Sequence, residues 1–118
     1  MRASITNDFV YDEVPTHRKL QGPDETLVAW QGWAAAFSDA APVFHGAWVS
    51  GNTVVLEVSW KGTHTGELDT PKGPIAPTGK RIHVRECNVT EIAETGKAKS
   101  QRSYFDIATM LHQIGVAT

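Results

Sequence analysis

Apolar residues recur at helical spacing in the first third of the chain. The stripe falls at i, i+3, i+7 and i+10, on Leu27, Trp30, Ala34 and Phe37, and Trp33 widens it. Glycine and proline at residues 22–23 precede the stripe. Proline suits the first helical turn, because its missing N–H would have no partner there anyway. The pattern predicts an amphipathic helix that begins at residue 22 and turns aromatic side chains toward another element.

A two-residue alternation replaces the helical period further along the chain. Residues 43–60 predict a hairpin with a turn at residues 50–52. On its second arm, one face carries Val54, Leu56, Val58 and Trp60. Glu57 falls on the opposite face, which is therefore predicted to be the outer, polar one.

The last part of the chain adds two more strands and a short helix. Residues 80–92 and 97–105 predict strands, and Asp106 then stands at the N-cap of a helix that ends at Gly115. Residues 66–79 hold three prolines and predict a loop. Residues 9–14 predict a short edge strand that pairs with residues 18–20.

This order of strand, helix, antiparallel meander and helix predicts an α+β domain. A curved sheet over an aromatic helix encloses a concave apolar wedge, which is the usual shape of a small-molecule site. The chain of 118 residues is long enough for one domain, residues 1–118, and too short for two.

Charge and composition exclude several kinds of partner. Eleven Lys and Arg against thirteen Asp and Glu give a net charge of −2, so the chain lacks the basic footprint of a nucleic-acid binder. No run approaches the ~20 apolar residues of a membrane helix, and the polar start at residues 1–4 does not resemble a signal peptide. We therefore expect a cytoplasmic protein without a membrane partner. Cys87, the single cysteine, has no internal disulfide partner, and the histidine spacing predicts no metal site.

Several short motifs, in this order and spacing, resemble the SnoaL-like polyketide cyclase family. They are KGTHTG at 61–66, IAPTGKRI at 75–82, ETGK at 94–97, YFD at 104–106 and MLHQIG at 110–115. The family belongs to the folds similar to nuclear transport factor 2 and ketosteroid isomerase, and the resemblance spans residues 8–115. It implies a cone-shaped, curved antiparallel sheet wrapped around helices, a hydrophobic cavity, a homodimer formed through the sheet and no cofactor.

The chain departs from the family at its N-terminus. Family members carry a long helix before the segment that corresponds to residues 7–10, which here lies almost at the start. The resemblance thus implies a domain without the first helix. We expect either an open cone mouth or a mouth that another subunit covers.

The resemblance also implies a chemistry, in which a carboxylate removes an acidic proton and an intramolecular aldol condensation closes a ring. The family's acid–base aspartate corresponds to Ser103, and its histidine falls near Asn88. Neither replacement is a general base unaided. Two functions follow: a domain that binds a small apolar or polyketide-like ligand, with cyclase or isomerase chemistry, or a non-catalytic ligand-binding or dimeric assembly domain.

Two residues are candidate catalytic groups. Asp106 is close to the position of the family aspartate, but an N-cap role is the favoured interpretation, because Thr109 follows three residues later. His64 lies at a strand end between two glycines, where a turn anchor is favoured over an acid–base group.

The candidate ligand-binding residues combine aromatic side chains with a few polar ones. They are Trp30, Trp33, Phe37, Trp60, Glu86, Asn88, Ser103 and Tyr104. Glu86 and Asn88 share a strand face with Ile82 and Val84, which is the cavity face if no bulge intervenes.

A homodimer is the predicted assembly. Trp48, Val55 and Val89 lie on strand faces beyond what one helix can cover. Large exposed apolar patches usually mark interfaces.

Overall fold

The computed structural model describes residues 4–70 and 72–116, so the expectations for residues 1–3 and for Pro71 lie outside the described part. The chain order follows the predicted one of strand, helix, meander and helix. The elements are β1 (Ile5–Glu13), a 3-10 turn (Val14–Thr16), β2 (Arg18–Gln21), α1 (Gly22–Ala36), β3 (Ala41–Ser50), β4 (Thr53–Thr63), β5 (Leu68–Thr70), β6 (Gly73–Ile75), β7 (Arg81–Ile92), β8 (Ala98–Phe105) and α2 (Ile107–Gln113).

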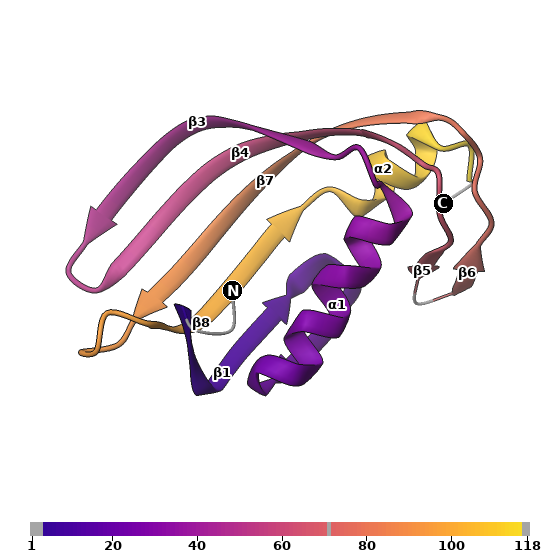
Figure 1. Ribbon diagram of the computed structural model, residues 1–118. Helices are drawn as coiled ribbons and strands as arrows, with labels where there is room; N and C mark the ends of the chain where they lie inside the picture. The colour runs from indigo at the N-terminus through magenta and orange to yellow at the C-terminus, as the bar shows by residue number, and fades with distance from the viewer. Residues whose placement is uncertain (1–3, 71, 117–118) are drawn as a thin grey trace.

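One curved sheet of six strands dominates the fold, in the order β2-β1-β8-β7-β4-β3. Its concave side wraps around α1, as Figure 1 shows. Because β2 and β3 are both edges, the sheet does not close into a barrel. The predicted α+β class with a curved sheet over a helix is confirmed.

Two features of the sheet differ from the prediction. β1 pairs with β8 in parallel, so the sheet is mixed, not purely antiparallel. β1 is also not an edge strand, because it lies between β2 and β8. A proline follows residues 9–14, which is typical of an edge strand, but the pairing with β8 involves the far end of the chain and leaves no local signal.

Helix α1 begins at the predicted glycine and proline, with Asp24 and Glu25 in its first turn. Its most buried residues, Thr26, Ala29 and Ala36, each precede one position of the predicted stripe. The stripe itself forms a cavity wall, because Trp30, Ala34 and Phe37 line that cavity, and Trp30 and Phe37 also pack into the core on either side of it.

Two hydrophobic clusters lie on either side of this cavity. Near β1, the buried cluster contains Ile5, Phe9, Tyr11 and Ala29. Near α2, it contains Ala36, Phe37, Leu68, Ile82, Val84, Met110 and Ile114. The predicted final helix is confirmed, and Asp106 is its N-cap.

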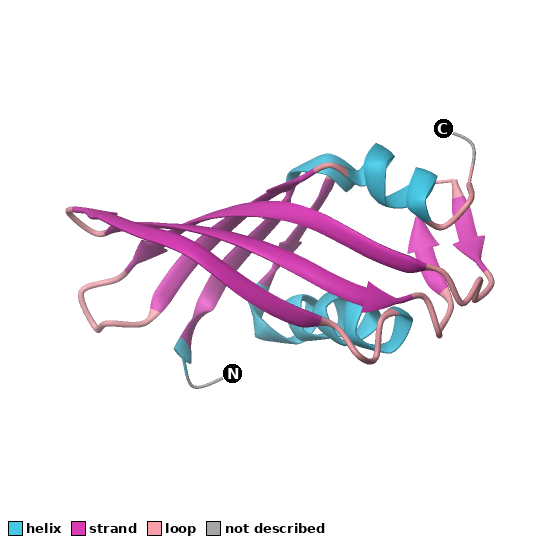
Figure 2. Cartoon of the chain, turned by 90° about the horizontal axis from the view of Figure 1, so that it is seen from above, coloured by secondary structure: helices cyan, strands magenta, loops and turns pink. Residues whose placement is uncertain are grey.

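The predicted loop at residues 66–79 contains the short strands β5 and β6, which pair with each other at the same end of the molecule as α2 (Figure 2). Gly66 begins this segment, where its N–H donates to the Ala36 carbonyl at 3.1 Å. A Cβ atom at Gly66 would lie 2.0 Å from the Ala35 carbonyl oxygen, so only glycine allows this approach to the end of α1. Within the described ranges, none of the helices has the length and apolar character that crossing a membrane requires.

Candidate functional site

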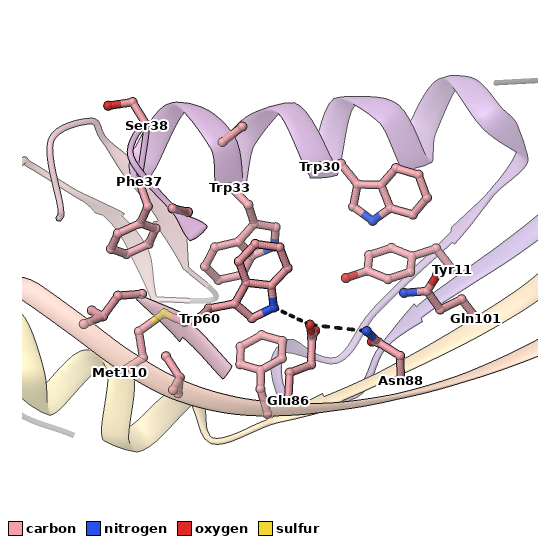
Figure 3. A pocket seen from close by; sticks show the side chains of 15 residues that line it. Tyr11, Trp30, Trp33, Phe37, Ser38, Trp60, Glu86, Asn88, Gln101 and Met110 are labelled. Carbon is pink, nitrogen blue, oxygen red and sulfur yellow. Dashed lines mark hydrogen bonds between the residues drawn. The ribbon is translucent and has the colours of Figure 1, made fainter. Parts of the chain in front are cut away.

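A cavity of about 500 Å³ lies between α1 and the concave face of the sheet. This volume falls within the range of small-molecule sites, about 300–1,000 Å³. Six aromatic side chains line it: Tyr11, Trp30, Trp33, Phe37, Trp60 and Phe105. In Figure 3, Trp30 and Tyr11 lie at one end, Phe37 and Met110 at the other, and Glu86 between them.

The entrance lies where α1 ends. Ala34, Ser38 and Ala40 line the cavity and are exposed, whereas Ile82, Val84 and Met110 line it and are buried. The cavity therefore opens beside the α1–β3 connection and is closed by apolar side chains near α2.

Glu86 places a carboxylate in this apolar cavity. It projects from β7 toward α1 (Figure 3). Its Oε1 accepts hydrogen bonds from Trp60 Nε1 at 2.8 Å and from Asn88 Nδ2 at 3.4 Å, and its Oε2 accepts one from the Ser103 hydroxyl. All three donors are uncharged. They hold the carboxylate in one orientation, as a proton-accepting group in a ligand site requires.

Asn88 lines the cavity beside Glu86. Its amide nitrogen faces Glu86, so its Oδ1 points elsewhere. Oδ1 is buried and accepts no hydrogen bond from the described residues. A buried acceptor without a donor is costly, so the Asn88 amide orients Glu86 at the expense of its own oxygen.

Behind the aromatic wall lies a second carboxylate, Glu13, which is 0% exposed. Arg18 forms an ion pair with it at 3.0 Å, and Trp33 Nε1 donates to it at 2.7 Å. Thr16 and the Tyr11 phenol donate at 2.6 and 3.0 Å. Burial, followed by the charge of Glu13, raises the pKa of Tyr11 above its ordinary value, so the phenol stays protonated.

The fold and this cavity agree with the comparison to known families. The profile of the SnoaL-like polyketide cyclase family matches residues 1–114. The chain belongs to that family. No curated protein matches the sequence.

Solved structures show the same SnoaL-like fold. A SnoaL-like protein from Jannaschia sp. CCS1 superposes with a TM-score of 0.86 at 17% identity, covering 99% of this chain and 77% of that chain. TsrD from Streptomyces laurentii gives 0.80 at 16% identity, with 98% and 80% covered. IdmH from Streptomyces antibioticus, a candidate polyketide cyclase, gives 0.74 at 24% identity, with 98% and 84% covered.

The structure brings most of the predicted ligand-binding residues together. Six of them line the cavity, namely Trp30, Trp33, Phe37, Trp60, Glu86 and Asn88. The β4–β7 register runs without a bulge, so Glu86 and Asn88 keep the predicted face. Ser103 lies just behind the wall, fully buried, with its hydroxyl on Glu86.

Tyr104 does not line this SnoaL-like cavity. Its side chain is 42% exposed on the outer face of the sheet. Neighbouring strand residues point to opposite faces, and both Ser103 and Phe105 point inward. The strand period alone could have separated Tyr104 from Ser103.

The two predicted catalytic candidates also lie outside the cavity lining. Asp106 is exposed and accepts from the Thr109 N–H at 3.0 Å and hydroxyl at 2.6 Å, and these bonds lower its pKa. His64 is buried, and its Nδ1 accepts from the Thr78 N–H at 3.2 Å. These contacts are those of a helix cap for Asp106 and of a turn anchor for His64, the structural roles favoured for them by the sequence.

Sequence analysis missed several residues of the site, among them Tyr11, Gln101, Phe105 and Met110 in the cavity lining and Glu13 behind it. Tyr11 and Gln101 line the cavity, and they are register partners in the parallel β1–β8 pair. The alternation of Phe9, Tyr11 and Glu13 was the available signal, since all three are buried. In residues 4–70 and 72–116, no three His, Cys, Asp or Glu side chains are grouped to hold a metal ion.

Proposed function

We propose that this protein is a cofactor-independent acid–base enzyme that binds a small, mainly apolar carbonyl compound and uses Glu86 as the proton acceptor. The observation that carries the proposal is the position of Glu86. Among the described residues it is the one carboxylate that lines the aromatic cavity, and three neutral donors fix its orientation.

The corresponding reaction is an enolisation followed by an intramolecular aldol step. Glu86 takes a proton from a carbon next to a carbonyl group, and the C–H electron pair forms an enolate. The enolate carbon then forms a C–C bond with a second carbonyl carbon, whose oxygen becomes an alkoxide. The protonated Glu86 returns its proton to that alkoxide, so the carboxylate is regenerated and no oxidant or cofactor is consumed.

The remaining polar groups of the cavity suit a carbonyl oxygen. Figure 3 shows the Trp30 indole nitrogen and the Gln101 amide at the Tyr11 end, beyond Glu86. Such N–H groups stabilise negative charge that develops on oxygen. Family membership and the likeness to IdmH, a candidate polyketide cyclase, support the same class of reaction.

Hydrogen–deuterium exchange tests this role of Glu86. We expect the protein to accelerate exchange of the α-protons of acetophenone in D₂O, measured by NMR. Glu86→Gln should lower the catalysed rate by about 10²-fold or more. Glu57→Gln is the matched control, because Glu57 pairs with Arg85 on the outer face at 3.0 Å, and it should leave the rate unchanged. Equal rates for the wild type and Glu86→Gln would overturn the catalytic proposal.

The alternative function is non-catalytic binding of the same kind of ligand. It is favoured by Ser103 and Asn88, which stand where the resemblance places the acid–base aspartate and its histidine. Saturable binding of acetophenone together with no exchange above the buffer rate would support it.

We also propose that the outer sheet forms a homodimer. Trp48 is 56% exposed on the edge strand β3, and its neighbours across the sheet on the same outer face, Val55 and Val89, are half-buried. We expect a dimer in sedimentation at micromolar concentration and a monomer for Trp48→Glu. A wild-type monomer at that concentration would contradict this assembly.

A further inference from the structure

Among the described residues that line the cavity, only one side chain is charged. These fifteen residues include the Glu86 carboxylate and no Lys, Arg or His, and Arg18 is paired with Glu13 behind the wall. An anionic ligand would therefore enter without a cationic partner and would lie near a carboxylate. Such an arrangement is expensive in a low-dielectric site.

The charge of Glu86 is not neutralised by the protein. Its hydrogen-bond donors are an indole, an amide and a hydroxyl, all of them neutral. None of the ion pairs formed between described residues involves Glu86. Glu13 differs, because Arg18 supplies its counter-charge. A positive group in the cavity would give Glu86 the partner that it lacks.

The aromatic walls favour the same kind of group. Trp33 and Trp60 each donate their N–H to a carboxylate, Glu13 and Glu86 respectively, at 2.7 and 2.8 Å. With these N–H groups occupied, the two indoles contribute apolar aromatic surface to the wall, where Trp33 stacks with Phe37 and meets Phe105 edge to face. A hydrogen bond to an anion polarises its donor further. Alkylammonium groups bind to aromatic side chains through cation–π attraction.

Glu86 fixes the amide orientation of Asn88. Its amide nitrogen is turned to Glu86, which leaves its buried Oδ1 without a donor from the described residues. The opposite amide orientation would bring two acceptors together, so Glu86 fixes this one.

We propose that the substrate of this cavity is a small organic cation, whose alkylammonium group lies against the aromatic walls near Glu86. This inference rests on the proposed function, because it names the substrate class for the same cavity. The two are compatible, since a positive charge near a carbonyl compound stabilises the enolate and makes its α-proton easier to remove.

An isosteric series tests the charge preference directly. The full chain is titrated with choline, with neohexyl alcohol, in which carbon replaces the choline nitrogen, and with the anion of tert-butylacetic acid. Binding is followed by the NMR shifts of the tryptophan indole N–H groups. We expect choline to bind at least about tenfold more tightly than the alcohol, and the anion to bind weakest. Equal or tighter binding of the alcohol, comparable binding of the anion, or no binding of choline would overturn the proposal.

Variants separate the contributions of the Glu86 charge and of the aromatic side chains to the preference for choline. Glu86→Gln should reduce the ratio of choline to alcohol affinity severalfold, whereas the outer-face variant Glu57→Gln should leave it unchanged. Phe105 lines the cavity without a polar atom, so Phe105→Leu should lower choline affinity and leave alcohol affinity within about threefold. An unchanged ratio in both cavity variants would contradict this assignment even if wild-type choline binding were tight.

The exchange assay distinguishes the cation site from the role of Glu86 as the base. A choline preference together with unchanged exchange in Glu86→Gln would retain the cation site and reject the base. Loss of exchange in Glu86→Gln, together with no preference of the wild type for choline over the alcohol, would retain Glu86 as the base and reject the cation site.

Discussion

Glu13 and Glu86 are two carboxylates on the same sheet, and each accepts an indole N–H from a cavity tryptophan. Glu13 is fully buried, pairs with Arg18 and accepts from Tyr11, Thr16 and Trp33. Glu86 lines the cavity and accepts only from neutral donors. The charge of Glu13 is compensated within the protein by Arg18. The charge of Glu86 can be compensated by a ligand or by a proton.

This difference distinguishes a carboxylate that stabilises the fold from one that can act on a ligand. Buried charges are retained when partners compensate them, so Glu13 fixes Trp33 and Tyr11 in the cavity wall and holds β1 to β2 through Arg18. A carboxylate without a counter-ion is the kind that functional sites contain. The comparison predicts that Glu13 matters to stability and Glu86 to ligand chemistry.

The largest expected effect is the loss of stability on Glu13→Gln. The substitution removes the counter-charge of Arg18 and places an amide N–H group among donors. We expect the free energy of unfolding to fall by about 3 kcal/mol, measured by urea denaturation.

Glu86→Gln is the matched control in the same denaturation series. The amide oxygen can still accept from Trp60, and the amide nitrogen can donate to the Ser103 hydroxyl. A change within about 1 kcal/mol is expected. A loss as large as that of Glu13→Gln would remove the distinction between the two glutamates.

The local part of this comparison could be predicted from the sequence. Alternation in residues 80–92 placed Glu86 and Asn88 on the cavity face, because a bulge-free antiparallel pair keeps its period. The glycine and proline at the start of α1 and the aspartate before α2 fixed both helix starts, because capping depends on a few adjacent residues.

The long-range part could not be predicted. The structural role of Glu13 depends on its hydrogen bond with Trp33, which lies twenty residues later in the sequence. Tyr11 and Gln101 meet only because β1 joins β8 in parallel. A parallel pair needs a long crossover, and no local pattern near residue 11 shows which distant strand will lie beside it. The apolar stripe of α1 likewise could not show whether it faces a packed core or a cavity.

His64 is, like Glu13, a fully buried ionisable side chain, and its expected effect is the smallest. It is fully buried beside Phe37, with ring centroids 5.4 Å apart, and its Nε2 has no partner among the described residues. Burial lowers the pKa of His64 below the ordinary 6.5. Its Nδ1 accepts from the Thr78 N–H, so a proton there would also remove an acceptor.

The sign of the pH dependence follows from that lowered pKa. Above about pH 6.5 the imidazole is neutral in both the folded and the unfolded chain. Below this pH the unfolded chain binds a proton that the folded chain does not. The free energy of unfolding should therefore fall as the pH is lowered from 7 to 5, by at most about 1.4 kcal/mol per pH unit from this residue. His64→Asn keeps an acceptor for Thr78 but cannot titrate, so its unfolding free energy should fall less over this range. His83→Asn, at an exposed position, should retain the wild-type slope. If His64→Asn also retained that slope, then His64 would not be a buried neutral group, and only the two glutamates would remain in the comparison.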